Sequence, residues 1–216
     1  AKNIVTEKKH KYLITSRNLE KYLGKKIFRE DLDDLSPQVG VTTGMAWTAV
    51  GGVTLEIETI KMPGSGKLIL TGQMGDVMKE SAKIGLSYIR SIMEEYNIES
   101  DFFDTHEIHI HIPEGAVPKD GPSAGITMAT AILSAVIQRK IRADVAMTGE
   151  LSLRGRVLPI GGLKEKVLAA KMADIKTVIV PYKNKIDIEE LSKEITDGLE
   201  IVYVKELKEV LKKAFA

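Results

Sequence analysis

The stretch that decides the fold is Pro118-Lys119-Asp120-Gly121-Pro122-Ser123-Ala124-Gly125, which is followed at once by a largely apolar run over 126–137. The glycines and prolines predict a turn, and the run predicts a buried helix over about 123–139. Backbone N–H groups at the start of a helix have no partner inside it, and the helix dipole favours negative charge there. A serine hydroxyl in this position is therefore a candidate nucleophile with oxyanion-binding donors beside it.

The pattern Gly121-x-Ser123-x-Gly125 also fits the nucleophile elbow of the α/β-hydrolases. In that class the chain order is serine, acid, histidine. The four histidines of this chain all precede the serine: His10, His106, His109 and His111. The α/β-hydrolase class is therefore excluded. If Ser123 is activated, its base is an upstream histidine or a residue of another type.

Composition sets the broad class of protein. The 216 residues are 44% hydrophobic and 28% charged, which is typical of one sizeable globular domain or of a domain with an appendage. A net charge of +1 gives no long-range attraction to nucleic acid or to a membrane. We find neither a signal-peptide pattern nor an apolar run near the roughly 18–20 residues of a membrane span. The absence of cysteine excludes disulfides and cysteine catalysis, and a reducing cytosol is the simplest location.

The chain falls into a short first part and a longer second part. Residues 5–26 have apolar residues at helical spacing and end near Gly24, and a polar linker over 29–36 leads to Pro37. In the second part we expect strands at about 45–60, with a break at Gly51-Gly52, and at 67–71, 108–112, 145–148, 156–158, 177–181 and 200–204. We expect helices from Asp76, as N-cap, to 96, and over 123–139, 163–173 and from 205 onward. Strands and helices alternate without a strict βαβ repeat, which predicts an α+β fold with a mixed sheet.

The segment Gly64-Ser65-Gly66-Lys67 resembles part of a phosphate-binding loop. The Walker pattern requires a glycine where Lys61 stands and a serine or threonine where Leu68 stands. Because both positions differ, we interpret the segment as a turn between two strands and expect no ATP site in this chain.

The histidines of the 108–112 strand offer a second chemistry. Glu107, His109 and His111 alternate, so they project from one face of the strand and could form part of a metal site. No further histidine follows, no cysteine is present, and we expect no metal. Either histidine is also a candidate base for Ser123, although Asp120 is too near in sequence to orient it. We favour histidines that are hydrogen-bonded beneath the site.

A lysine is the remaining candidate base. In the predicted 163–173 helix, Lys166 falls beside Leu163, Ala170 and Ala173, whereas Lys164 lies on another side. Burial disfavours the charged form and lowers the pKa of a lysine. A base that works near neutral pH needs a pKa about 3 pH units below 10.4, which corresponds to about 4 kcal/mol. A lysine whose stem lies along the helix flank, with its ammonium in water, is the simpler alternative.

Taken together, these motifs resemble the proteolytic domain of the Lon family of ATP-dependent proteases, of the bacterial and mitochondrial type. The resemblance covers about 40–216 and includes the serine motif, the strand His109-Ile110-His111-Ile112-Pro113-Glu114-Gly115, Thr148-Gly149-Glu150 and the run 155–166. It implies a Ser–Lys dyad in which Ser123 is the nucleophile and Lys166 the general base, with Thr148 bound to the lysine. It also implies that the turn formed by Asp120, Gly121 and Pro122 supports the serine.

The family resemblance carries further expectations. The fold is expected to resemble the ribosomal protein S5 domain 2-like fold. Residues 1–38 are expected to be the tail of an ATPase lid module and a linker, and 39–216 the peptidase domain. No cofactor is expected in this domain, whereas ATP and Mg²⁺ are implied for the ATPase module. A homo-hexamer, unfolded or damaged proteins as substrates, and the bacterial cytoplasm rather than the mitochondrial matrix are also implied.

Three alternatives stay open. Lon-like domains can serve as catalytically idle assembly scaffolds, although such a scaffold has no need of both Ser123 and Lys166. Proteins of related fold bind phosphate at a helix start, which would here be 121–125. The turn over 120–123 can also fold over the site in an inactive arrangement.

Overall fold

The computed structural model describes residues 13–24, 36–48, 51–113 and 119–216, and the chain divides into compact units over 1–34 and 35–216. In the first unit, helix α2 (Leu19–Leu23) ends at Gly24, as expected. The predicted helix is wrong for 13–18, because Asn18 accepts the Thr15 N–H (2.8 Å) and donates to the Leu13 carbonyl (2.9 Å), which holds a turn. The other parts of the predicted helix, 5–12 and 25–26, lie outside the described residues, as do 29–35 of the predicted linker.

The second unit is built on a mixed sheet, which confirms the predicted α+β class. Its seven strands have the order β11-β10-β7-β2-β3-β5-β4. The neighbouring pairs β11–β10, β10–β7 and β7–β2 are parallel. The pairs β2–β3 and β3–β5 are antiparallel, and the pair β5–β4 is parallel again. Their bounds are β2 (Val41–Thr48), β3 (Gly51–Pro63), β4 (Leu68–Thr71), β5 (His106–His111), β7 (Val145–Met147), β10 (Thr177–Pro181) and β11 (Glu200–Val204).

Two small ladders accompany this sheet. Strand β1 (Gln38–Val39) pairs with β6 (Lys140–Ile141), and β8 (Glu150–Leu151) pairs with β9 (Val157–Leu158). The predicted break at Gly51-Gly52 falls at the start of β3, where Gly51 pairs with Thr48 and Gly52 with Trp47 in the β2–β3 hairpin. Residues 64–67 form the predicted turn between β3 and β4. The segment that resembles a phosphate loop is therefore a strand connection.

The helices of this unit differ from the predictions mainly at their ends. Asp76 is the first residue of helix α3 and not its cap, which is Gly75. None of the described helices is long and apolar enough to cross a membrane. Their bounds are α3 (Asp76–Ser91), α4 (Phe102–Thr105), α5 (Gly125–Ile137), α6 (Leu163–Met172), α7 (Lys185–Glu189), α8 (Lys193–Thr196) and α9 (Leu207–Ala214), with 3₁₀ turns η1 (Met93–Tyr96), η2 (Pro122–Ala124) and η3 (Tyr182–Asn184).

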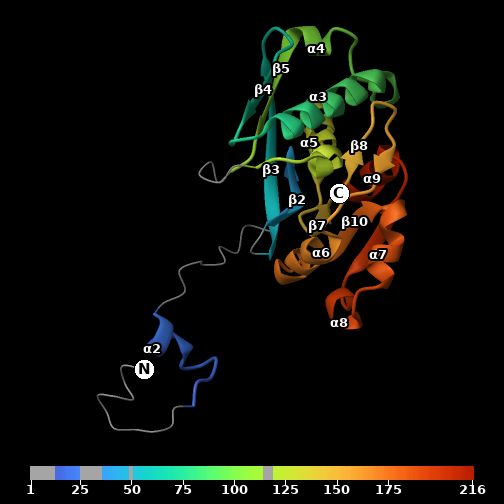
Figure 1. Ribbon diagram of the computed structural model, residues 1–216. Helices are drawn as coiled ribbons and strands as arrows, with labels where there is room; N and C mark the ends of the chain where they lie inside the picture. Colours follow the sequence, from blue (N-terminus) through green and yellow to red (C-terminus); the bar gives the residue numbers. More distant parts are fainter. Residues whose placement is uncertain (1–12, 25–35, 49–50, 114–118) are drawn as a thin grey trace. The chain divides into compact units, whose positions relative to one another are not determined.

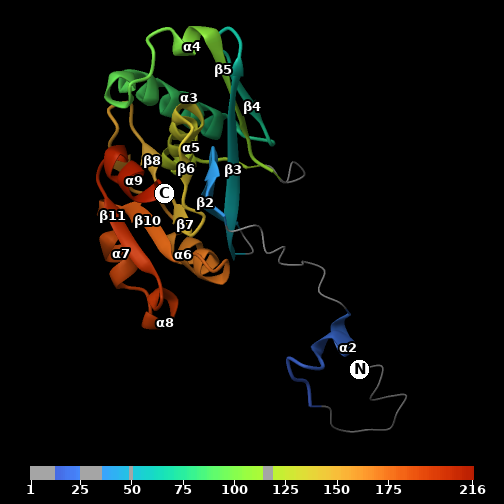
Figure 2. The same cartoon turned by 180° about the vertical axis from the view of Figure 1, so that it is seen from behind.

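Strand β7 is buried on both faces and separates two hydrophobic cores. Val145 and Met147 belong to the core that α5 fills, whereas Ala146, between them, packs in a second core with Val167 of α6. Side chains alternate along a strand, so α5 and α6 cover opposite faces of the sheet at β7. Figures 1 and 2 show α3 beside α5, and α6 near the lower ends of β2 and β3.

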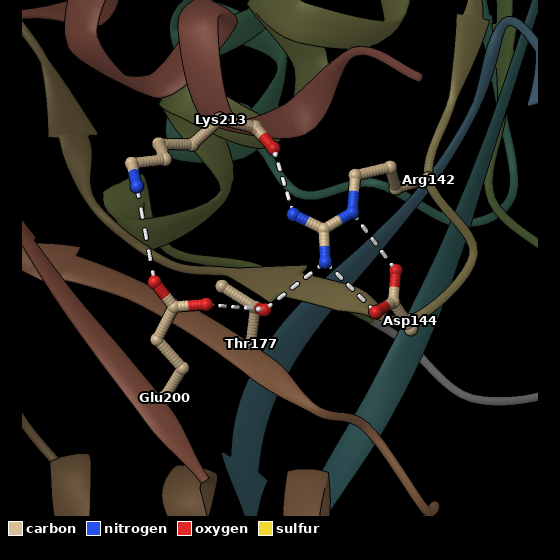
Figure 3. Close-up of polar contacts among 5 residues, drawn as sticks. All are labelled: Arg142, Asp144, Thr177, Glu200 and Lys213. Atoms are coloured by element: carbon tan, nitrogen blue, oxygen red, sulfur yellow. Dashed lines mark hydrogen bonds and ion pairs between the residues drawn. The ribbon is translucent and has the colours of Figure 1, made fainter.

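A polar network closes the amino end of the parallel strands (Figure 3). The guanidinium of Arg142 donates to both carboxylate oxygens of Asp144 (3.1 and 2.8 Å), to the Thr177 hydroxyl (3.3 Å) and to the carbonyl of Lys213 in α9 (3.3 Å). The Thr177 hydroxyl in turn donates to Glu200 (3.2 Å). Because Thr177 and Glu200 begin β10 and β11, the network joins α9 to the first residues of these strands.

Candidate active site

The candidate nucleophile lies on a 3₁₀ turn just before α5. Ser123 is the middle residue of η2, and α5 begins at Gly125, so the helix predicted from Ser123 starts two residues later. Gly121 has a φ of 130°, a value that favours glycine, and Pro122 is the first residue of the turn. This backbone geometry leaves Ser123 half-buried at the start of a fully buried helix.

Asp120 fixes this loop to a different helix. Its Oδ1 atom accepts the backbone N–H of Met78 and of Gly121, each at 2.9 Å. Met78 lies in the first turn of α3, whose cap Gly75 has no side chain, so Asp120 supplies the missing capping oxygen from elsewhere in the chain. The Gly75 N–H also donates to the carbonyl of Lys119 at 2.7 Å. Sequence reasoning missed this link, and a helix that begins after a glycine was the available signal.

The same contact narrows the choice of oxyanion donors. The N–H of Gly121 is bound by Asp120, and Pro122 has no N–H. These two residues therefore offer no free backbone N–H to an oxyanion. The backbone N–H of Ser123 itself has no partner among the hydrogen bonds of the described residues, so it stays a candidate donor.

Thr148 joins the end of β7 to the serine loop. The residue is fully buried, and its hydroxyl donates to the carbonyl oxygen of Ser123 at 3.2 Å. The N–H of Gly149 donates to the same carbonyl at 2.8 Å, and the Gly149 carbonyl accepts the N–H of Ile126 at 3.2 Å. The carbonyl of Ser123 is thus held at the carboxyl end of β7 by two hydrogen bonds, and a third joins Gly149 to the start of α5.

Lys166 is buried, which decides between the two alternatives that its position on the helix left open. It is 2% exposed and shares one face of α6 with buried Leu163 and Ala170, although Ala173 is exposed. Burial lowers the pKa of Lys166 from 10.5 to about 8. Its Nζ atom donates to the Thr148 hydroxyl at 3.4 Å. The alternative of a lysine that extends into water is therefore excluded for Lys166, whereas Lys164 is exposed.

Thr148 connects the side chain of Lys166 to the backbone of Ser123, and the three residues come from separate parts of the fold. Thr148 accepts from Lys166 and donates to the Ser123 carbonyl, so one threonine couples the amine to the serine backbone. Within the described part of the chain, the hydroxyl of Ser123 itself makes no hydrogen bond. One buried threonine thus binds both a lysine of lowered pKa and the backbone of a serine whose hydroxyl has no partner among the described residues.

The histidines occupy another position. His109 Nε2 and His111 Nδ1 lie 2.9 and 2.8 Å from the hydroxyl of Thr71 on β4. This confirms that they are hydrogen-bonded histidines, and no hydrogen bond joins either to Ser123 among the described residues. Glu107 instead accepts from the backbone and hydroxyl of Ser65. Nowhere in the described part of the chain do three histidine, aspartate or glutamate side chains gather as a metal site would require.

The fold and the site define a class: an α+β domain with a mixed sheet that brings a serine loop and a buried lysine to the end of one strand. The comparisons identify the family. The model of the Lon protease (S16) C-terminal proteolytic domain matches residues 13–216. The chain therefore belongs to the Lon protease family, as its proteolytic domain.

Curated relatives agree with this assignment. The chain is 60% identical over 210 residues to the Lon protease of Lachnoclostridium phytofermentans, which covers 97% of the chain and 26% of that protein. It is 54% identical over 214 residues to Lon protease 1 of Bacillus subtilis, covering 99% of the chain and 28% of that protein. It is 52% identical over 202 residues to the Lon protease of Clostridioides difficile, covering 94% of the chain and 26% of that protein. The chain thus spans about a quarter of the length of these relatives.

Proposed function

We propose that this chain hydrolyses peptide bonds with a Ser–Lys dyad in which Ser123 is the nucleophile and Lys166 the general base. The observation that carries the proposal is the burial of Lys166, which lowers its pKa to about 8 and aims its amine at the threonine that holds the serine loop. A general base must be unprotonated when it acts, so a pKa near the working pH suits the role.

Thr148 gives the amine its orientation. Its one hydroxyl proton is directed at the Ser123 carbonyl, so toward Lys166 its oxygen acts as an acceptor. A neutral amine that donates one N–H to Thr148 keeps its lone pair for another partner. The proposed partner is the hydroxyl of Ser123, which the described hydrogen bonds leave without one.

The reaction then follows in two stages. Ser123 Oγ bonds to the peptide carbonyl carbon while its proton passes to Lys166 Nζ, and the carbonyl oxygen becomes an oxyanion beside the Ser123 N–H. When the C–N bond breaks, the Lys166 ammonium returns the proton to the leaving amine, and an acyl-enzyme remains. Water attacks the ester carbon while Lys166 takes its proton. The bond between this carbon and Ser123 Oγ then breaks, Lys166 returns the proton to Oγ, and the acid product leaves.

The sheet offers a place for an extended substrate next to this site. Strand β7 pairs with β2 only at Thr43 and Gly44, so 45–47 of β2 have β3 on one side and no described strand on the other. Gly44 lies opposite Met147, and Thr148 follows at once. An unfolded peptide that adds as a strand along 45–47 would therefore run past Thr148.

The remainder of the proposal concerns the whole protein, because the chain spans only about a quarter of the length of its relatives. By family membership we propose that an ATPase module with ATP and Mg²⁺ feeds unfolded or damaged proteins to this domain. We further propose assembly into a homo-hexamer in the bacterial cytoplasm, with residues 1–38 as the end of the ATPase lid and a linker.

Cleavage of a fluorogenic peptide and of unfolded casein tests the dyad against the idle scaffold. The assay compares the chain with Ser123→Ala, Lys166→Met and the control Lys164→Met, which removes an exposed lysine from the same helix. We expect the chain and the control to cleave without ATP, and both dyad variants to lose about 10³-fold or more. Cleavage that survives in Lys166→Met refutes the dyad. No cleavage by any of the four folded proteins favours the scaffold.

A further inference from the structure

The side chain of Asn184 is fully engaged with a loop that the proposed mechanism does not mention. Asn184 is 4% exposed and ends η3. Its Oδ1 atom accepts the N–H of Ile160 (3.0 Å), and its Nδ2 atom donates to the Ile160 carbonyl (2.8 Å) and to Asp187 (2.6 Å). Both backbone groups of one residue are thus paired with a single carboxamide, as an adjacent strand would pair them.

Ile160 lies close to the start of the helix that carries Lys166. Gly162, two residues later, is the N-cap of α6, adopts a left-handed φ of 66° and provides no side-chain capping bond. Its carbonyl accepts the N–H of Lys166 at 3.2 Å, a bond of the first helical turn. Hydrogen bonds and two peptide links therefore connect Asn184 through Ile160 and Gly162 to Lys166.

The position of this helical turn decides the environment of the amine. Lys166 is the fourth residue of α6, its Nζ atom reaches Thr148 at 3.4 Å, and the side chain is 2% exposed. A long lysine stem turns its ammonium to water whenever the backbone allows it. If the uncapped start of α6 could shift, the lysine stem could turn its ammonium into water. Bonds that fix Ile160 therefore help to keep Lys166 away from solvent.

We propose that Asn184 is a positioning residue for Lys166: by clamping both backbone groups of Ile160 it fixes the start of α6 and holds the amine in its buried place beside Thr148. The proposal deepens, and rests on, the function proposed for Lys166. Asparagine suits the role because aspartate lacks the donor, leucine lacks both groups and glutamine is one methylene longer.

Ser134 provides a matched control for loss of structure. Its hydroxyl is also buried and also links two backbone segments, since it accepts the N–H of Gly40 and donates to the carbonyl of Arg139. These bonds lie at the end of α5, away from α6. Ser134→Ala should therefore lower stability without affecting the surroundings of Lys166.

Two measurements report the pKa of Lys166 in the unchanged chain and in the variants Asn184→Leu and Ser134→Ala. The first is the titration of the Lys166 side chain by NMR with ¹³Cε-labelled lysine, its signal assigned by its loss in Lys166→Met. The second is the pH dependence of kcat/KM for the fluorogenic peptide. In the chain both midpoints are expected near 8. In Asn184→Leu we expect both to rise by about 1 pH unit or more toward the value in water, because the amine regains solvent.

The outcomes separate this inference from the function on which it rests. A midpoint that stays near the chain's value in folded Asn184→Leu, or that rises equally in Ser134→Ala, overturns the positioning role and leaves the dyad intact. If Asn184→Leu does not fold, Asn184→Gln replaces it. Glutamine keeps the amide group, but its extra methylene displaces Ile160. An unchanged NMR midpoint of Lys166 in Asn184→Gln would also overturn the positioning role. Activity that survives in Lys166→Met overturns the dyad, while the NMR titration still decides whether Asn184 keeps Lys166 buried.

Discussion

Replacing the buried lysine should make the protein more stable at neutral pH. In Lys166→Met a side chain of similar length and volume fills the same apolar face of α6 without a charge. Thr148 keeps its bond to the Ser123 carbonyl, and only a 3.4 Å contact with the amine is lost. The free energy of unfolding should therefore fall little through changed packing, and it should rise because a buried ammonium is removed.

The size of this gain follows from the pKa of the lysine. Burial lowers the pKa from 10.5 to about 8, so between these values the unfolded chain binds more protons than the folded chain, and stability rises with pH. The cost of the buried lysine is about 3 kcal/mol at pH 7, about 2 kcal/mol at pH 9 and close to zero above pH 11. The advantage of Lys166→Met should fall along the same curve.

Urea denaturation of the chain and of Lys166→Met at several pH values from 7 to 11 measures this difference. All other titrating groups are common to both proteins and cancel in the subtraction. Lys164→Met, which changes an exposed lysine on the same helix, controls for the loss of a charge. A difference that is independent of pH, or a Lys166→Met variant that is less stable at pH 7, would refute the reasoning.

Three further predictions concern the loop, the helix start and the polar network. Asp120→Ala removes the capping oxygen of α3 and should lower the free energy of unfolding by about 1–2 kcal/mol and reduce peptide cleavage; unchanged urea denaturation would contradict this. Gly162→Ala puts a Cβ atom 2.3 Å from the ring of Trp47 at a φ of 66°. It should cost about 1–3 kcal/mol and shift the fluorescence of Trp47, the single tryptophan of the chain; an unchanged emission spectrum would exclude the contact. Arg142→Met breaks the links to Asp144 and α9 and should lower the free energy of unfolding by about 1–3 kcal/mol, with cleavage by the folded protein unchanged; lost cleavage at unchanged stability would place the network in the site.

Local patterns in the sequence predicted much of the fold. The buried run 177–181 is β10, the break at Gly51-Gly52 marks the start of β3 in a hairpin, and Leu163 and Ala170, predicted to lie beside Lys166 on its helix, are buried as it is. Each of these features depends on residues a few positions apart, where periodicity and turn chemistry act directly. The start of α5 was placed wrongly because η2 shares the composition of a helix but not its backbone.

Contacts between distant segments could not be predicted in the same way. Asn184 binds Ile160 across 24 positions, Asp120 binds Met78 across 42, and Arg142 reaches Lys213 across 71. No local pattern predicts such partners, because the topology of the sheet decides which loops meet. The motif of Ser123 indicated the chemistry, whereas the groups that hold the site in place became visible only in three dimensions.

The burial of Lys166 also bears on the safety of a protease during its own synthesis. In an unfolded chain the lysine has a pKa near 10.5, and about 0.03% of it is neutral at pH 7, against about 10% in the folded domain. The groups of the proposed site come from η2, from the residue after β7 and from α6, and β7 pairs with β10, which is translated later still. With Lys166 as the base, a nascent or damaged chain has neither the geometry nor the free amine to cut its neighbours. The proposed activity therefore depends on the folded domain that buries Lys166.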